Sequence, residues 1–191
     1  MTLLLIGLFL FFITHSVSIY AFQWRQRMVV KMGEVPWKAV YSLIALLGFV
    51  LIIMGFQTAR LNPEVIYIAP VWTRHITFLL MLPVFPLLLA TYLPGRIQAA
   101  VKHPMLIAVK TWAFSHLLSN GNLAEVLLFG SFLVWAVVDR ISLKRRPLRP
   151  VKEAPASKYN DVIAIVGGLV LYAVFLRWGH RWLIGMPLIA S

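Results

Sequence analysis

The sequence predicts an all-α bundle of about six membrane-spanning helices, forming a single domain over residues 1–191. Of these residues, 61% are hydrophobic and only 13% are charged, against about 45–50% and about 25% in soluble domains. The apolar residues gather in runs that approach the roughly 20 residues needed to cross a bilayer. Most lysines and arginines lie in the short segments between these runs. Together these observations exclude a soluble enzyme, a secreted domain and a disordered tail.

Each predicted span is an apolar run bounded by polar residues. The third run contains Pro83 and Pro86, which remove backbone donors and are expected to kink the helix. The fourth and fifth runs are joined by Asn120-Gly121-Asn122, a tight turn that predicts an antiparallel hairpin. The predicted spans are residues 2–23, 37–56, 71–93, 104–119, 123–139 and 161–178.

The distribution of Lys and Arg predicts the orientation. With the amino terminus outside, the inner segments hold thirteen basic residues and the outer segments hold four, as the positive-inside rule requires. We therefore expect both termini on the outer, periplasmic side. This placement also explains the net charge of +12 without a nucleic-acid partner. Because the first basic residue is Arg25, the first span lacks a charged n-region and is expected to be a retained anchor.

Residues 140–160 form the longest predicted loop. They carry seven basic residues and three prolines, including Pro150, against the single acid Glu153. We expect this loop to rest on anionic lipid headgroups. Docking of an acidic partner is the alternative.

Several kinds of chemistry find no support in the sequence. The chain has no cysteine, which excludes disulfides, thiolate metal sites and a cysteine nucleophile. It also lacks a GxGxxG fingerprint, a P-loop, an HExxH motif and a nucleophile elbow. Hydride transfer on a Rossmann domain, ATP-driven transport and zincin proteolysis are therefore not indicated.

Ionisable residues inside the predicted spans mark the candidate site, because such groups are costly and usually face the bundle interior or a functional site. Neutral imidazole is a common metal ligand, and two histidines on different helices can hold haem iron between them. The alternative is a set of histidines that hydrogen-bond to neighbouring helices. His15, His75 and His116 lie within predicted spans, and His103 and His180 lie at opposite interfaces.

Depth in the bilayer distinguishes between the possible histidine pairs. At about 1.5 Å per residue, His15 and His116 differ by about 9–10 Å in depth, whereas His75 and His116 differ by about 4 Å. This geometry alone predicts that His75 and His116 form the pair.

The fourth predicted span has the most unusual composition. Trp112, His116 and Asn120 are four residues apart and share one helix face. Lys110 points about 120° away from His116, so it is expected to reach the inner headgroups or to pair with an acid on another helix. The candidate acids are Asp139 and Asp161.

Arginine side chains suit carboxylates. If a porphyrin lies in the outer half of the bundle, the candidate partners for its propionates are Arg74, Arg177 and Arg181.

The block from His103 to Leu106, followed by Trp112 to Ala124, resembles the signature of the NnrU family. The resemblance extends over essentially the whole chain and implies a multi-pass protein of the bacterial inner membrane. The resemblance also implies a link to denitrification and nitric-oxide metabolism, with which the member that gives the family its name is associated. Further matching segments are Thr14-His15-Ser16, Tyr41-Ser42-Leu43, Tyr92-Leu93-Pro94-Gly95, Asp161 and the stretch from His180 to Leu188.

The family is also similar to 15-cis-zeta-carotene isomerase, a plant membrane enzyme that uses haem b. By this resemblance, His15 and His116 match its haem-ligating histidines, and His103 matches a further histidine. This chain has Ala113 where that enzyme has a cysteine implicated in a ligand switch. The resemblance therefore implies haem b on His15 and His116, while the switch cannot be carried over.

The leading hypothesis is a haem-b-binding inner-membrane protein linked to nitrogen-oxide or redox metabolism. Its iron ligands are expected to be His15 and His116, with Trp112, Asn120 and Arg74 around the cofactor. Nitric oxide or an apolar small molecule is the expected partner within the lipid bilayer. The alternatives are a haem-dependent isomerase of an isoprenoid, a methyltransferase suggested by Lys102-His103-Pro104, and a structural subunit without a cofactor.

Overall fold

The structure is a computed structural model that describes residues 1–147 and 152–188. All named elements in these residues are helices, which confirms the predicted all-α class. Arg149 and Pro150, both in the predicted loop, lie outside the described residues. The elements are α1 (Thr2–Tyr20), α2 (Phe22–Met32), α3 (Glu34–Ala59), α4 (Thr73–Met81), α5 (Val84–Ala90), α6 (Arg96–Val101), α7 (Pro104–Ser119), α8 (Leu123–Ser142), α9 (Asn160–Val174), a π-helical turn (Phe175–Gly179) and α10 (His180–Ile184).

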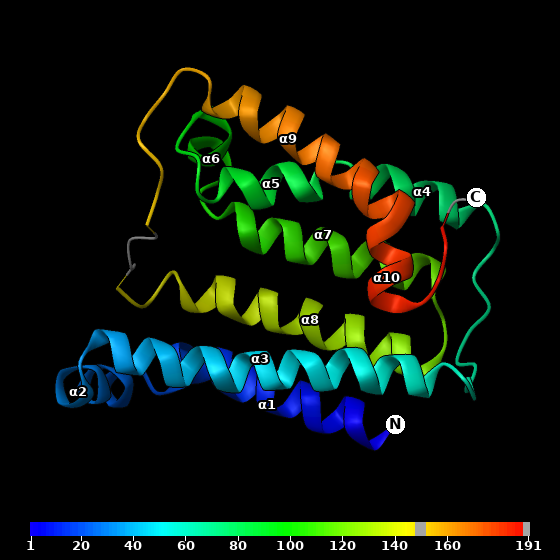
Figure 1. The fold of residues 1–191 in the computed structure, drawn as a ribbon, viewed down its shortest axis with the longest axis horizontal. Coiled ribbons are helices and arrows are strands. Elements are labelled where there is room, and N and C mark those ends of the chain that lie inside the picture. The colour runs from blue at the N-terminus through cyan, green and yellow to red at the C-terminus, as the bar shows by residue number, and fades with distance from the viewer. Residues whose placement is uncertain (148–151, 189–191) are drawn as a thin grey trace.

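The long helices run side by side and alternate in direction (Figure 1). In chain order the passes are α1, α3, α4 with α5, α7, α8, and α9 with α10. One end of the bundle, here called the terminal end, carries residue 1, loop 60–72, turn 120–122 and residues 185–188. The opposite end, here called the basic end, carries α2, residues 91–103, residues 143–147 and residues 152–159.

Four of the six predicted spans have helices long and apolar enough to cross a membrane: Thr2–Tyr20, Glu34–Ala59, Thr73–Ala90 and Asn160–Ile184. The remaining two predicted spans correspond to α7, which has 16 residues, and α8, which has 20. Helix α8 also contains Glu125, Asp139 and Arg140. Large apolar side chains such as Phe9, Leu43 and Val166 are exposed on the outside of the bundle. Such surfaces indicate a membrane environment.

The predicted hairpin is present, and the kink predicted at Pro83 and Pro86 is a helix break at Pro83, with Pro86 inside α5. Helix α4 ends at Met81 and α5 begins at Val84 after Pro83, because proline cannot continue the hydrogen-bond ladder. Helices α7 and α8 pack against each other as an antiparallel pair. The N–H of Asn122 donates to the Glu125 carboxylate at 2.9 Å, which stabilises the start of α8. Val65 forms an isolated antiparallel bridge with Asn122, so loop 60–72 touches the tip of this hairpin.

Helix α7 lies between two apolar clusters. One cluster joins α7 to α1, α3 and α8, and it includes Leu4, Phe56, Ala113 and Phe129. The other joins α7 to α4, α5 and α9 through Met81, Val84, Ala108 and Tyr172. The central position of α7 means that its side chains face both halves of the bundle.

Close helix approach depends on glycine at two contacts. A Cβ on Gly55 would lie 2.2 Å from the backbone nitrogen of Leu4, where α3 crosses α1. A Cβ on Gly168 would lie 2.3 Å from the nitrogen of Pro86, where α9 packs against α5. Small residues allow membrane helices to pack this closely.

Gly168→Ala is expected to lower the melting temperature, because the added methyl would meet backbone atoms of α5 that cannot move aside independently. Overpacking of this kind costs about 1–3 kcal/mol. Gly130→Ala is the matched control, because a Cβ there meets nothing within 4 Å, and it is expected to stabilise α8 by up to about 1 kcal/mol. Thermal unfolding in detergent measures both variants. Equal melting temperatures would contradict the close α5–α9 contact.

Candidate functional site

A cavity of about 810 Å³ opens between α1, α7 and α8 near the basic end. Its apolar walls include Phe11, Leu106, Val109, Phe132 and Trp135. Its volume lies within the usual range of ligand sites, about 300–1,000 Å³. Its other end is polar and includes Gln98, Lys102, His103, Asp139, Arg146 and Glu153.

His15 lines this cavity from α1. Its Nδ1 lies 2.8 Å from the carbonyl oxygen of Phe11, one helical turn earlier. A carbonyl oxygen only accepts hydrogen bonds, so Nδ1 carries the proton and Nε2 keeps its lone pair. The imidazole stacks on the Phe11 ring at 4.0 Å and meets the Trp135 ring at 5.8 Å and 90°. These contacts fix the ring plane of a potential metal ligand.

Two buried N–H groups of cavity residues lack a hydrogen-bond partner within the described part of the chain. They are Nε1 of Trp135 and Nη1 of Arg146. Nη2 of Arg146 is bound to Asp139 at 2.5 Å, so the described residues satisfy only one edge of the guanidinium. A buried polar group without a partner is unusual and requires an explanation. A ligand with hydrogen-bond acceptors in this cavity supplies one.

His116 has the same local arrangement as His15 but does not line the same cavity. Its Nδ1 lies 2.8 Å from the carbonyl oxygen of Trp112, and its ring stacks on Phe129 at 4.5 Å. A chain of aromatic contacts separates the two imidazoles: Trp112 meets Phe132 at 5.3 Å, Phe132 meets Phe11 at 5.2 Å, and Phe11 stacks on His15. The structure therefore does not bring His15 and His116 together on one cavity wall.

Trp112 and Asn120 share the face of α7 that carries His116, and both have structural partners. Trp112 packs edge-on against Phe129 at 5.1 Å. The side-chain amide of Asn120 donates to the carbonyl of His116 at 2.8 Å. The backbone carbonyl of Asn120 accepts a hydrogen bond from the Tyr67 hydroxyl at 2.8 Å. Asn120 thus ends α7 and anchors loop 60–72.

The arginines of the terminal end hold the C-terminal segment. Nη2 of Arg74 donates to the carbonyl of Leu188 at 2.7 Å, and its guanidinium lies over the Phe78 ring. Arg60 donates to the carbonyl of Ile184 at 3.1 Å. Arg74 does not line the His15 cavity, so the predicted propionate partner lies at the opposite end of the bundle from the cavity's polar end.

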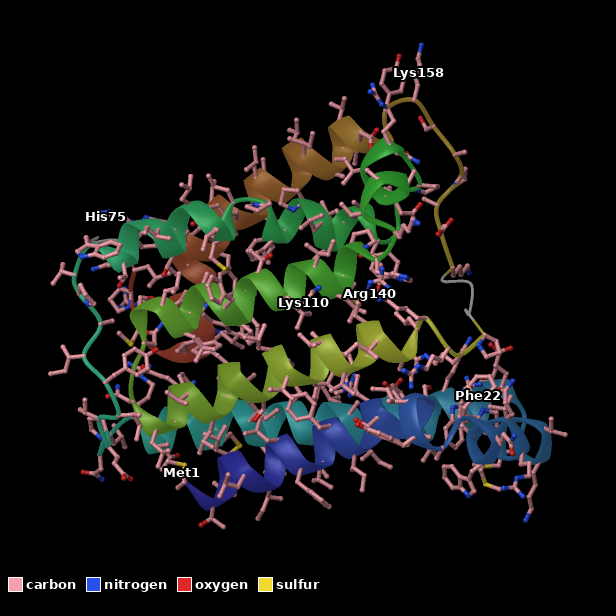
Figure 2. All side chains as sticks on the ribbon, turned by 180° about the vertical axis from the view of Figure 1, so that it is seen from behind. Met1, Phe22, His75, Lys110, Arg140 and Lys158 are labelled. Atoms are coloured by element: carbon pink, nitrogen blue, oxygen red, sulfur yellow. The ribbon has the colours of Figure 1, made fainter. Side chains whose placement is uncertain are left out.

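The predicted pairing of His75 with His116 is wrong. His75 is exposed near the start of α4, at the terminal end (Figure 2). Thr73 and Thr77 are buried, and the hydroxyl of Thr77 donates to the carbonyl of Ser115 on α7 at 2.7 Å. Residues two positions from His75 therefore face α7, and His75 faces away. The depth argument could not give the rotation of His75 about its helix axis.

The predicted acidic partners of Lys110 are also wrong. Lys110 lies midway along α7 (Figure 2). Asp139 binds Arg146 instead. The Asp161 carboxylate accepts the backbone N–H groups of Arg96 at 2.9 Å and Ile97 at 3.1 Å. Asp161 thus caps α6 and ties it to α9.

His103 is the second histidine of the cavity, at its polar end. Burial lowers the pKa of His103 below its ordinary value of 6.5, and the charges of Arg140 and Lys102 lower it further, while Asp139 opposes them. The imidazole is therefore neutral at pH 7. At the terminal end, His180 has its Nδ1 2.9 Å from the carbonyl of Met186.

Sequence reasoning missed Trp135 and the pair Asp139–Arg146. The seven-residue spacing of the pair across the end of α8 was a usable signal, because a chain that turns back after a helix can place such residues together. The unpaired N–H of Trp135 has no signature in the sequence. Within residues 1–147 and 152–188, no three His, Asp or Glu side chains gather closely enough to hold a metal ion between them.

Comparison with known proteins gives one match. A family model described as NnrU protein matches residues 3–188, nearly the whole chain. No curated protein and no solved structure matches the chain.

Proposed function

The chain belongs to the NnrU family, and we propose that it is a multi-pass protein of the bacterial inner membrane that binds haem b beside His15. The proposal rests on two observations about His15. Its Nδ1–H donates to the Phe11 carbonyl, and its side chain lines a cavity of about 810 Å³. Ligating histidines usually have their other ring nitrogen fixed in this way. Nε2 of His15 is thus the candidate iron ligand.

The residues of the cavity fit a porphyrin in two further respects. Haem b is a planar apolar macrocycle with two carboxylates on one edge, and the cavity has aromatic walls with one polar end. The unpaired Nε1 of Trp135 lies in the wall beside His15. Bound haem would supply an iron that changes oxidation state and that can hold a small ligand in an open position. Nitric oxide as that ligand agrees with the association of the family with denitrification.

His116 is the second iron ligand implied by the resemblance to the isomerase. A series of ring contacts through Trp112, Phe132 and Phe11 links it to His15, and it does not line the His15 cavity. We therefore assign His15 as the primary ligand. Ligation by His116 is the alternative, and the histidine variants distinguish it from ligation by His15.

A second candidate function is haem-dependent isomerisation of a polyene. An open apolar groove of about 500 Å³ runs between α1 and α8, and Trp135 lines both this groove and the His15 cavity. The groove offers an apolar molecule a route from the bilayer towards the cavity. Incubation of the reduced protein with a cis-polyene tests this function, and the absence of an isomerised product would count against it.

The test of the proposed function is an optical spectrum of the purified protein, produced with haem available and recorded before and after reduction with dithionite. A Soret band with sharp reduced α and β bands is expected for low-spin haem b. A flat visible spectrum, with the protein folded and haem present during synthesis, would overturn the proposal.

We also propose that α7 and α8 cross the membrane, giving six spans with both termini outside. The bridge between Val65 and Asn122 supports this. Because loop 60–72 follows α3, a helix long and apolar enough to span, the hairpin tip reaches the same side as the end of α3. The excess of basic residues at the opposite end supports a cytoplasmic location for that end.

Single cysteines test this topology without background, since the chain contains none. Asn62→Cys lies in the exposed loop of the terminal end, and Ser157→Cys lies at the basic end, also exposed. In intact cells, a membrane-impermeant maleimide is expected to label the cysteine at position 62 but not that at position 157. Permeabilised cells should label both. Labelling of position 157 alone in intact cells would mean the reverse orientation.

A further inference from the structure

We propose that the polar end of the His15 cavity is a clamp for two carboxylates, formed by Arg146 and Lys102. This inference rests on the proposed function and deepens it, because it defines the class of ligand: an apolar body with two acidic groups at one edge. It also replaces Arg74, Arg177 and Arg181, the arginines that the sequence suggested for this role.

The first half of the clamp is the unsatisfied edge of Arg146. The side chain is only 17% exposed, and Asp139 accepts from Nη2 at 2.5 Å. Nη1 is buried and has no partner in the part of the chain that the structure describes. A guanidinium presents its donors in a rigid planar fork that matches carboxylate oxygens. Nη1 is therefore a donor for which none of the described residues provides an acceptor.

The second half of the clamp is Lys102, between α6 and α7. Among the described residues it is the single non-glycine residue with positive φ, at φ 62° and ψ −37°. Such a conformation is unfavourable for a lysine, and backbone strain of this kind concentrates at ligand-binding positions. A glycine would be the relaxed choice here. The strained turn instead places a lysine, whose ammonium group is carried on a flexible stem, in the lining of the cavity.

Both acids of the polar end have a hydrogen-bond partner within the protein. Asp139 occupies one edge of Arg146, and Glu153 accepts a hydrogen bond from the side-chain amide of Gln98 at 2.8 Å. Each acid thus already has a partner in the protein. What remains for a ligand is Nη1 of Arg146 and the Lys102 ammonium, which are two cationic donors for two carboxylates.

The experiment compares haemin with haemin dimethyl ester, in which both carboxylates are blocked. Each compound is titrated into the purified full-length protein without haem, and the Soret band reports binding. The wild type is expected to bind haemin about tenfold or more tightly than the ester, in keeping with the strength of charged hydrogen bonds. Arg146→Gln and Lys102→Gln should each reduce that preference. Lys144→Gln is the matched control, since Lys144 is exposed and does not line the cavity.

Two further variants test the clamp in case a single substitution at Arg146 or Lys102 disturbs folding. Asp139→Asn combined with Arg146→Gln removes the pair without leaving a buried charge, and it should also lose the preference for haemin. Lys102→Gly relieves the backbone strain, so it should raise the melting temperature of the ligand-free protein while weakening haemin binding. If Lys102 had only a structural role, Lys102→Gly would not both raise the melting temperature and weaken haemin binding.

Each outcome separates the clamp from the proposed function. Equal affinity of the wild type for haemin and its ester would overturn the clamp and leave haem binding on His15 intact. An undiminished preference for haemin in the Arg146 and Lys102 variants would also overturn it. Failure of the wild type to bind either compound would overturn the proposed function, and the clamp with it.

Discussion

His15→Ala is expected to purify without haem, because the substitution removes the proposed iron ligand from an otherwise apolar wall. Groups that only orient a metal ligand change metal affinity about 10–100-fold, so loss of the ligand itself is expected to exceed about 100-fold. The ratio of Soret to protein absorbance measures haem content. The fold should survive, since His15 is only partly buried and its polar contact lies within α1.

Two histidine variants are the controls for this experiment. His75→Ala is expected to keep full haem content, because His75 is exposed at the other end of the bundle. His116→Ala distinguishes ligation by His15 alone from ligation by both histidines. If this variant keeps its haem with an unchanged spectrum, His15 is supported as the primary ligand. Equal loss of haem in the His15 and His116 variants would support ligation by both. Full haem content in all three variants would contradict the assignment of His15.

Asp139→Ala is expected to cause the largest loss of stability among the substitutions considered. The carboxylate is the protein partner of a guanidinium that is only 17% exposed. Its removal leaves a largely buried charge with both edges unpaired. Breaking a buried ion pair in this way costs about 3–5 kcal/mol. The melting temperature of the ligand-free protein in detergent measures the effect.

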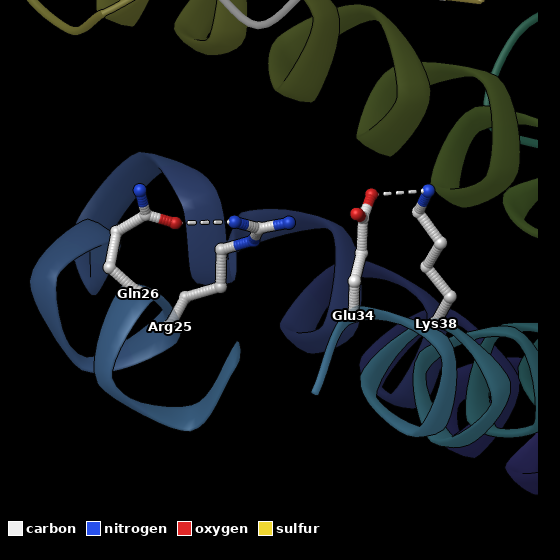
Figure 3. Close-up of polar contacts among 4 residues, drawn as sticks. All are labelled: Arg25, Gln26, Glu34 and Lys38. Carbon is white, nitrogen blue, oxygen red and sulfur yellow. Dashed lines mark hydrogen bonds and ion pairs between the residues drawn. The ribbon is translucent and has the colours of Figure 1, made fainter. Parts of the chain in front are cut away.

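Glu34→Ala provides the matched control for Asp139→Ala. Glu34 and Lys38 form an ion pair at 2.6 Å within α3, and both side chains are 66% exposed (Figure 3). Water screens such surface pairs, so little stability depends on them. The neighbouring contact of Arg25 with Gln26 is likewise on the surface (Figure 3). If Asp139→Ala and Glu34→Ala shifted the melting temperature equally, the buried pair would have no special role in the fold.

Residues that control the local backbone conformation predict most of the architecture. Pro83 separates α4 from α5, and Asn120-Gly121-Asn122 closes the α7–α8 hairpin, because backbone chemistry at these residues does not depend on distant partners. Span length is less reliable. Helix α7 has 16 residues and α8 carries three charges, so hydropathy alone supports four of the six predicted spans.

Side-chain partnerships across the bundle were much harder to predict. Asp161 was expected near Lys110, but its carboxylate caps α6. Arg74 was expected beside a cofactor, but it holds the carbonyl of Leu188. In each case the sequence gives the depth of a residue but not its rotation about the helix axis or the fold of a connecting segment. Those two properties decide which groups meet.

The residues that line the cavity lie far apart in the sequence. This separation determines when the site can be completed during synthesis in the cell. His15 belongs to the first helix, whereas Arg146 and Glu153 follow α8. At about 5–20 residues per second, the ribosome separates His15 from these residues by on the order of 10 s of synthesis. During that interval α1 can already pack on α3 at Gly55. If the proposed haem site is correct, its loading follows the synthesis of α8, and nascent chains that end before residue 146 should show a weaker preference for haemin over its ester than the whole chain.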